Sequence, residues 1–408
     1  MPAGVIGAVS TRIGLVLLAA LGLMVASGCR DSPEVKKERS FARAERYLND
    51  RRYNEAVIEF QNALQVDPHY VPALHGLGRA YAAKYFVFGA VQELGRARRL
   101  APDSISVATD YGRALVEIGA WSEADAEAAR IAEREPDNPD AAYIRAVSLL
   151  GQAKARECVD LLDRLPPAAR FAEIDAVRGE ALLNLGQPDL AEPAFRAALA
   201  ADPKDARGLT GLGAVSLAQG KYEAAVKHYL QAKALRPEVP RIRLWLAAAM
   251  ARLGQTDQAI AELEEVELQA RTPDIGMALA LHNLQADRPE QAVAHLAPIV
   301  RVAPRMADAR LLLASAYLAA GSPDNALVEL QELERQLPEE PAVQFRLALA
   351  EVQLGRPQEA LARLDAIGKV YERVPSYRVE RARALLLLGR LGEAQKEAEA
   401  AQRLAPTR

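Results

Sequence analysis

Small and apolar positions recur along this chain with a period of about 34 residues. The prolines show the period, because Pro68, Pro102 and Pro136 are each 34 residues apart. Such self-similarity is the signature of a repeat architecture. A ruler of this length, started at Lys37, divides the rest of the chain into eleven repeats, two of them one residue short. The repeats are expected to begin at residues 37, 71, 105, 139, 172, 206, 240, 273, 307, 341 and 375.

Two positions in every repeat hold a small side chain, which predicts two helices per repeat. The eighth place is always Ala or Gly, from Ala44 in the first repeat to Ala382 in the last. The twentieth place is Ala in every repeat but one, where Cys158 stands. Two helices approach to about 8 Å only where both present small side chains. Proline near the end of most repeats would stop the second helix, since it lacks an amide hydrogen and clashes with the preceding turn.

The first repeat carries a family pattern. Its characteristic residues stand at the spacings of the tetratricopeptide repeat (TPR) family, and they are Ala44, Tyr47, Ala56, Phe60, Ala63 and Pro68. The chain resembles this family over residues 37–408. The resemblance implies an all-α fold, a right-handed α-solenoid of about eleven helix-turn-helix repeats, with a groove that binds other proteins.

The resemblance also indicates which side chains line the groove, namely those at the second, fifth, ninth, twelfth and thirteenth places of each first helix. In the early repeats these places are polar, and the candidate polar groove comprises Glu45, His75, Arg79 and Arg113. In the late repeats they are apolar, and the candidate partner groove comprises Met277, Leu281, Leu284, Leu311, Leu318, Phe345, Leu349 and Val352. The apolar set either receives an amphipathic helix or apolar segment of a partner or packs between neighbouring repeats.

The first 28 residues have the pattern of a secretory signal. They carry one charged side chain, Arg12, followed by an apolar run and by small residues directly before Cys29. These small residues resemble the lipobox of bacterial lipoproteins, although that family usually has Leu where this chain has Ala26. The resemblance implies that residues 1–28 are removed, that Cys29 is lipidated and that residues 29–36 form a tether. A plain cleaved signal and an uncleaved anchor are the alternatives.

The residue after the lipidated cysteine influences sorting in Gram-negative lipoproteins, where Asp favours retention in the inner membrane. This chain has Arg30 at that place. The resemblance therefore implies a location in the bacterial cell envelope, anchored by lipid to the outer membrane and facing the periplasm.

Composition narrows the function classes. Lys and Arg together number 51 against 54 Asp and Glu, so there is no strong positive field to hold nucleic acid. Two cysteines exclude a disulfide framework, and Cys158 is interpreted as a small buried apolar residue. The five histidines lack metal-ligand spacing, and no HExxH, Walker or nucleophile-elbow motif occurs. We expect no enzymatic activity, no cofactor and no metal.

One turn stands out by its aromatic side chains. Tyr85, Phe86 and Phe88 lie between the two helices of the second repeat, where the family usually has a glycine and an acidic residue. They either face a partner or fill space against the next repeat.

The sequence as a whole predicts a non-enzymatic, lipid-anchored scaffold that mediates protein–protein interactions in an envelope export or assembly complex. Its expected partners are the membrane, through the N-terminal lipid, and other envelope proteins, through amphipathic or apolar segments. The stretch 53–68, together with the lipobox, is similar to TPR lipoproteins of exopolysaccharide and exosortase (PEP-CTERM) systems. The alternatives are an assembly factor for outer-membrane proteins or pili, and a regulatory subunit of a cell-wall or glycan enzyme.

Overall fold

The computed structural model of the chain describes residues 32–166, 171–266 and 271–404, and within them all regular structure is α-helical. The chain divides into two bodies, Met1–Ala201 and Asp202–Arg408. The N-terminal body contains α2 (Pro33–Asn49), α3 (Tyr53–Val66), α4 (Val71–Ala83), α5 (Val87–Leu100), α6 (Ile105–Glu117), α7 (Trp121–Arg134), α8 (Pro139–Gly151), α9 (Ala155–Asp163), α10 (Ala172–Asn184) and α11 (Pro188–Ala201).

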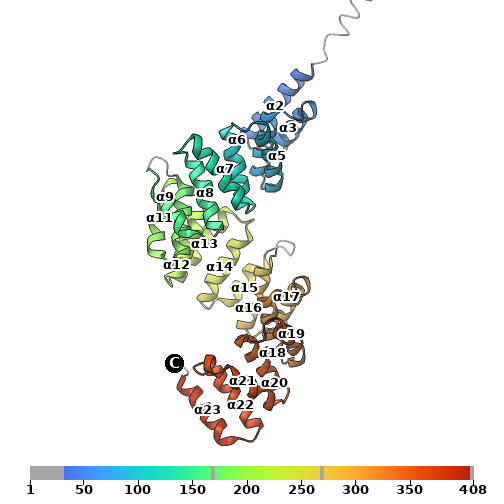
Figure 1. Ribbon diagram of the computed structural model, residues 1–408, viewed down its shortest axis with the longest axis vertical. Helices are drawn as coiled ribbons and strands as arrows, with labels where there is room; N and C mark the ends of the chain where they lie inside the picture. Colours follow the sequence, from blue (N-terminus) through green and yellow to red (C-terminus); the bar gives the residue numbers. More distant parts are fainter. Residues whose placement is uncertain (1–31, 167–170, 267–270, 405–408) are drawn as a thin grey trace, which may run out of the picture. The chain divides into compact units, whose positions relative to one another are not determined.

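The C-terminal body continues the pattern of paired helices. It contains α12 (Ala206–Ala218), α13 (Tyr222–Leu235), α14 (Pro240–Arg252), α15 (Thr256–Glu264), α16 (Pro273–Gln285), α17 (Pro289–Val302), α18 (Ala307–Ala319), α19 (Pro323–Gln336), α20 (Pro341–Gln353), α21 (Pro357–Tyr371), α22 (Pro375–Leu387) and α23 (Leu391–Leu404). Figure 1 shows the helices of each body following one another in chain order.

The first helices begin close to the repeat starts expected from the sequence. From the second repeat on, each first helix begins at the residue that the 34-residue ruler gives, for example at Val71 and Ile105. Several of these helices have proline in their first turn, where its missing N–H costs no hydrogen bond. The first helix differs, because α2 begins at Pro33, four residues before the ruler. Ser32 caps it by accepting a hydrogen bond from the Val35 N–H at 3.3 Å.

This early start changes the expected tether. Residues 33–36 of the expected tether 29–36 belong to α2 and are helical. The signal segment 1–28 and Cys29 lie outside the described residues.

Small residues at the helix crossings allow the helices of a repeat to approach closely. At Gly179 of α10 an added Cβ would lie 2.7 Å from the ring of Phe195 on α11. At Gly213 of α12 it would lie 2.6 Å from the ring of Tyr229 on α13. Both rings are buried, so the glycine and the aromatic ring form a matched pair. The small residue that recurs at the eighth place is therefore needed, because a larger side chain there would collide with the facing aromatic ring of the second helix.

The first helix of a repeat ends on a left-handed residue. Seven repeats use glycine for this, among them Gly119 with φ of 74°. In four other repeats the same place is taken by Arg51, Tyr85, Ala153 and Asp287, with φ between 57° and 60°. The left-handed turn therefore forms even in the repeats that have no glycine at this place.

Cys158 is buried on α9, as the sequence predicted. Burial raises the pKa of its thiol to about 12, so the reactive thiolate is scarce at neutral pH. Cys158 thus packs as a small buried apolar residue. None of the helices among the described residues has the length and apolar character needed to cross a membrane.

Candidate functional site

Two sets of polar contacts join successive first helices of the N-terminal body, and together we call their residues the polar ladder (His75, Arg79, Asp110, Arg113 and Asp140). His75 Nε2 on α4 lies 2.6 Å from Asp110 Oδ2 on α6. Arg79, one turn further along α4, reaches the same oxygen at 4.0 Å. All three side chains keep part of their surface exposed. The contacts therefore join successive repeats while leaving polar groups open to a partner.

Arg113 forms the next step of the polar ladder. It donates to Asp140 Oδ1 of α8 from Nε at 3.0 Å and from Nη2 at 2.6 Å, and Glu173 of α10 lies 3.8 Å from it. The guanidinium also lies 4.6 Å from the centre of the Tyr143 ring and 5.9 Å from that of Phe171. An Arg held between carboxylates and aromatic faces has a fixed orientation. About a third of its side chain remains exposed.

The structure brings two of the four predicted polar residues, His75 and Arg79, together at Asp110, and it places Arg113 on the same helix as Asp110, about one turn further along α6. Glu45 lies partly exposed on α2, and no polar contact among the described residues joins it to the polar ladder. Sequence reasoning missed the acidic partners Asp110 and Asp140. Asp140 occupies the second place of the fourth repeat, and the second place is one of the family's groove places. Applying the groove places to the fourth repeat as well as to the first three would therefore have identified it.

The late apolar residues mostly pack against their own chain. Leu318 and Val352 are buried, and Met277, Leu284, Leu311 and Leu349 are partly buried against the cores of neighbouring repeats. Phe345 stacks on Tyr371 with ring centroids 5.3 Å apart. Leu281 differs, with 45% of its surface exposed. For seven of the eight residues, this packing agrees with the expectation that they pack between neighbouring repeats. Partner binding at Leu281 stays a prediction.

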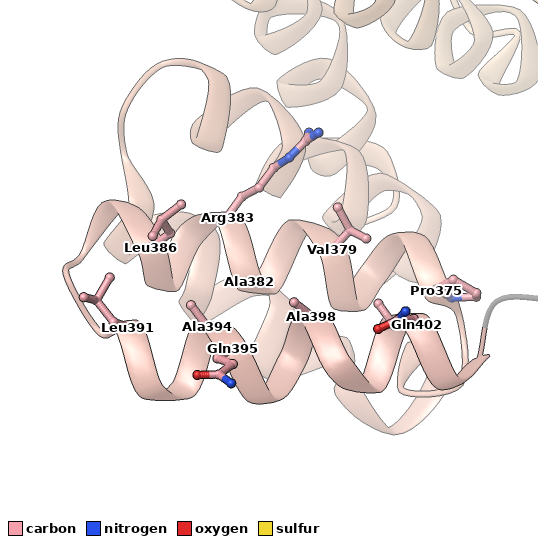
Figure 2. A pocket seen from close by; sticks show the side chains of 11 residues that line it. Pro375, Val379, Ala382, Arg383, Leu386, Leu391, Ala394, Gln395, Ala398 and Gln402 are labelled. Atoms are coloured by element: carbon pink, nitrogen blue, oxygen red, sulfur yellow. The ribbon is translucent and has the colours of Figure 1, made fainter.

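A cleft lies between α22 and α23, and we call it the α22–α23 cleft (Figure 2). Its volume is about 620 Å³. Its lining is mostly apolar and comprises Pro375, Val379, Ala382, Arg383, Leu386, Leu391, Ala394, Gln395, Ala398, Ala401 and Gln402. Leu386 is 58% exposed and Leu391 is 64% exposed. No helix among the described residues covers this cleft, which makes it an unfilled apolar surface.

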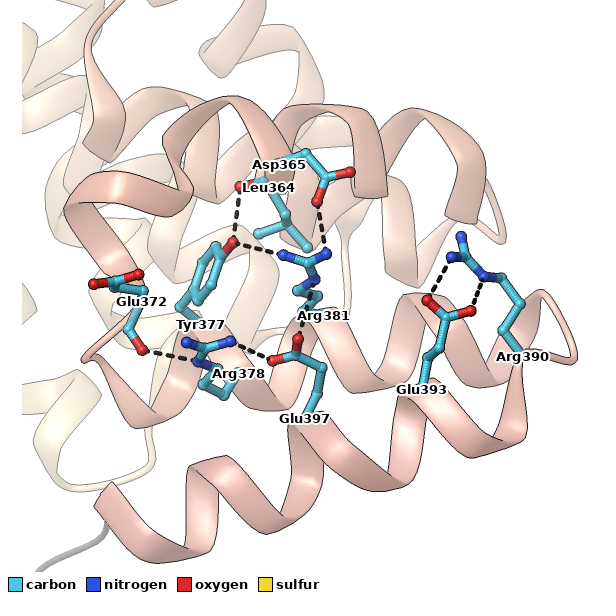
Figure 3. Close-up of polar contacts among 9 residues, drawn as sticks. All are labelled: Leu364, Asp365, Glu372, Tyr377, Arg378, Arg381, Arg390, Glu393 and Glu397. Atoms are coloured by element: carbon cyan, nitrogen blue, oxygen red, sulfur yellow. Dashed lines mark hydrogen bonds and ion pairs between the residues drawn. The ribbon is translucent and has the colours of Figure 1, made fainter.

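The corresponding surface of the preceding repeat, which we call the α20–α21 face, is filled. There, α22 packs against both α20 and α21. The Tyr377 hydroxyl donates to the Leu364 carbonyl oxygen at 3.0 Å, and Arg381 Nη2 pairs with Asp365 Oδ1 at 2.9 Å (Figure 3). Arg378 donates to the Glu372 carbonyl oxygen at 2.8 Å. Apolar packing and polar contacts at its edges thus fix α22 on the preceding repeat.

Tyr85 and Phe86 in the turn between α4 and α5 are exposed, as is Phe88, which lies in the first turn of α5 rather than between the helices. Phe86 also packs edge-on against Tyr81, with ring centroids 5.1 Å apart. The turn therefore does more than fill space within its own body, because most of its aromatic surface faces solvent.

The chemistry of these surfaces is that of binding. No group of three or more His, Cys, Asp or Glu side chains in the described ranges could hold a metal ion. The polar ladder offers oriented charges, and the α22–α23 cleft offers apolar surface. Both are features of protein interfaces.

Comparison with known proteins finds the same repeat family along the C-terminal body and the end of the N-terminal one. One tetratricopeptide repeat model matches residues 177–240, and a second matches residues 216–281, 283–344 and 318–379. Superkiller protein 3 of Schizosaccharomyces pombe (strain 972 / ATCC 24843) is 21% identical over 59% of this chain and 15% of its own length. Human protein O-mannosyl-transferase TMTC1 is 38% identical over 20% of this chain and 9% of its own length.

The chain thus spans a small part of the curated relatives that it matches. Among solved structures, the APC/C hetero-tetramer Cut9-Hcn1 is similar over 94% of this chain and 96% of the matched chain. Its TM-score is 0.49 and the sequence identity is 12%.

Proposed function

The chain is a tetratricopeptide repeat protein, and we propose that it is a non-enzymatic scaffold whose polar ladder binds a segment of another protein. Proteins of this family bind other proteins, and binding energy at protein interfaces concentrates on oriented Arg and aromatic side chains. The observation that carries the proposal is Arg113, which Asp140 and Tyr143 orient while part of its surface stays exposed.

The mixed charge of the polar ladder favours a partner segment that itself carries both charges. A carboxylate of the partner can pair with Arg79 or Arg113, and an amine or guanidinium can pair with Asp110. The existing ion pairs are partly exposed, so exchanging them for partner contacts costs little. We expect such binding to weaken as salt concentration rises.

The test is photo-crosslinking of the full chain in the cells that produce it, with Arg113→Ala as the variant. The matched control is Arg145→Ala, because Arg145 lies on α8, outside the polar ladder, and pairs with Asp125 at 3.4 Å. We expect partner yield to fall at least about tenfold for Arg113→Ala, a typical loss for an interface Arg, and to be kept for Arg145→Ala. Equal yields for the two variants would contradict the role of the polar ladder.

The location of the scaffold is a separate part of the proposal. We propose lipidation of Cys29 and an outer-membrane position facing the periplasm, supported by the resemblance of residues 26–29 to a lipobox and by Arg30. Mass spectrometry of the mature N-terminus tests this, with Cys29→Ala as the control. An unmodified Cys29, or sedimentation of the chain with inner membranes, would contradict it.

The identity of the protein captured by crosslinking would tell which pathway the scaffold serves. We propose an envelope export or assembly complex of the exopolysaccharide or PEP-CTERM kind, supported by the resemblance over residues 53–68. Capture of a polysaccharide-export or sorting protein agrees with it. Capture of a β-barrel or pilin would instead identify an assembly factor, and capture of a glycan enzyme would identify a regulatory subunit.

A further inference from the structure

Arg346 on α20 carries a positive charge that no carboxylate of the described residues pairs with. The side chain is half-buried. Its Nε donates to Ser315 Oγ on α18 at 2.7 Å, and its Nη1 donates to the Ala342 carbonyl oxygen at 3.0 Å. Nη2 has no acceptor among the described residues, and it keeps contact with solvent. Two neutral acceptors thus fix the guanidinium, while one of its nitrogens stays available.

Four other arginines of the same body that are buried or partly buried differ from Arg346, because each pairs with a glutamate. These pairs are Arg243–Glu262, Arg310–Glu329, Arg363–Glu351 and Arg378–Glu397. Burial disfavours the charge on Arg243 and Arg363, yet their glutamates raise the pKa of both above the ordinary value. Burial lowers the pKa of Arg346. Withdrawing a charge from water without an opposite charge is unfavourable, so a bound carboxylate would stabilise this side chain.

The same pair of places holds an ion pair in the polar ladder. Arg346 stands at the sixth place of its repeat, and Ser315 stands at the ninth place of the preceding one. In the N-terminal body these two places are taken by Asp110 and Arg79, whose charged groups lie 4.0 Å apart. The C-terminal body therefore keeps one charge at this contact and has a neutral hydroxyl where the opposite charge would stand. A carboxylate beside Arg346 would supply that missing charge.

The side chains around Arg346 are mostly apolar. Leu281 and Leu349 hold the same ninth place as Ser315 in the repeats before and after it, and the first helices of these repeats contact one another in succession. Leu281 is 45% exposed, and Leu349 is partly buried. Phe345, next to Arg346 in the sequence, stacks on Tyr371. A segment lying across these first helices would meet an apolar side chain, then the guanidinium, then another apolar side chain.

A fixed guanidinium with one nitrogen available favours a carboxylate, because charge-assisted hydrogen bonds are stronger than neutral ones. Partial burial strengthens the attraction, since the local dielectric constant is lower than that of water. We propose that Arg346 binds an acidic side chain within the apolar face of an amphipathic segment of a partner protein, with Leu281 and Leu349 contacting apolar residues on either side of that acid. This site rests on the proposed role as a protein-binding scaffold, but it shares no residue with the polar ladder.

Fluorescence anisotropy of the full chain in detergent, with a set of labelled amphipathic helical peptides, tests the site. The peptides have amidated C-termini and are made in pairs that differ only by Glu or Gln within the apolar face. The parent chain binds the tightest Glu peptide at least about tenfold more tightly than its Gln twin, the effect of one charge-assisted hydrogen bond. Arg346→Gln removes this preference. The control Arg335→Gln keeps it, because Arg335 is exposed on α19 and pairs with Glu332 of the same helix.

A second variant tests the site without removing Arg346. Ser315→Asp places a carboxylate of the chain's own where the hydroxyl accepts from Arg346 Nε. It abolishes the preference for Glu peptides, because the guanidinium then has its counter-charge within the chain. Ser315→Asn, which has the same size without the charge, keeps the preference. Circular dichroism checks that each variant retains its helical content.

Three results overturn the proposal. The first is a parent chain that shows no Glu preference for any pair of peptides, and the second is a preference that survives Arg346→Gln or Ser315→Asp. The third is Arg346-dependent binding of a Gln peptide with a free C-terminus in the absence of any Glu preference, because the carboxylate is then that of a chain end. Arg113→Ala leaves the Glu preference unchanged, so failure at Arg346 and failure at the polar ladder are seen separately.

Discussion

The α20–α21 face and the α22–α23 cleft are built from the same places of the 34-residue repeat, yet one is filled and the other is open. On the first, Leu364 and Ile367 are buried beneath α22. On the second, Ala398 and Ala401 line a hollow with exposed leucines at its turn end. The backbone positions correspond, but α22 covers the first surface, and no helix among the described residues covers the second. The repeat sets where an interface can form, and the next helix in space decides whether it is filled.

The two surfaces are expected to differ most in how much stability is lost when one of their leucine side chains is shortened to alanine. Leu364→Ala would leave a cavity in a core that cannot collapse, and we expect it to lower the free energy of unfolding by about 2–5 kcal/mol. The matched change Leu386→Ala removes an exposed side chain from the cleft and is expected to cost less than about 1 kcal/mol in the monomer. Urea unfolding measures both. Similar losses would mean that the cleft is not open in solution.

A smaller effect is expected from the polar contact that fixes α22 on the filled face. Tyr377→Phe removes the hydroxyl that donates to the Leu364 carbonyl oxygen at 3.0 Å, and with it one hydrogen bond between α22 and α21. We expect a loss of about 1 kcal/mol in the free energy of unfolding, measured by urea titration. No loss would show that packing of the ring alone holds α22 in place.

The filled surface should also respond to pH through Glu351 on α20. Burial raises the pKa of Glu351, although Arg363 Nε donates to its Oε1 at 2.7 Å. A carboxyl group whose pKa is raised by folding favours the folded chain below its unfolded pKa, and this contribution is lost as pH rises through its folded pKa. The parent chain should therefore lose stability relative to Glu351→Gln as pH rises above the ordinary carboxyl range.

Urea unfolding of the parent chain and of Glu351→Gln at acidic and at neutral pH measures this dependence. The matched position in the last repeat is Leu385, which is buried and cannot titrate. A stability difference between the two chains that does not change with pH would contradict the burial argument.

The smallest effect is expected where the cleft is filled artificially. Ala398→Leu restores the side chain found at Leu364, but no helix covers it among the described residues. We expect the free energy of unfolding of the monomer to change by no more than about 0.5 kcal/mol. Thermal unfolding measures this change. A larger change would mean that another segment covers this position.

Much of the fold followed from the spacing of small residues and prolines. The ruler placed the start of ten first helices because helix crossings need small side chains and helix ends need special residues. It missed the early start of α2, since Ser32 and Pro33 form a local cap that lies outside the repeat. It also could not show that Tyr85 and Asp287 would adopt the left-handed turn usually given to glycine.

The candidate site was predicted only in part. The groove places indicated His75, Arg79 and Arg113, and the structure joins them to Asp110 and Asp140 across repeats. The late apolar residues could not be assigned from sequence, because groove surface and inter-repeat packing demand the same side chains. Burial of Leu318 and Val352 shows their packing, a distinction that depends on contacts between neighbouring helices.

The sequence by itself determined the repeat, its helix boundaries and the close crossings, since these depend on local side-chain size and on backbone preferences within one repeat. Only the tertiary structure decided which apolar surfaces are covered. Leu364 and Ala398 stand at equivalent places, and nothing local tells which of them lies beneath another helix. Covering a surface is a property of the next element in space, so it becomes visible only once the helices are packed together.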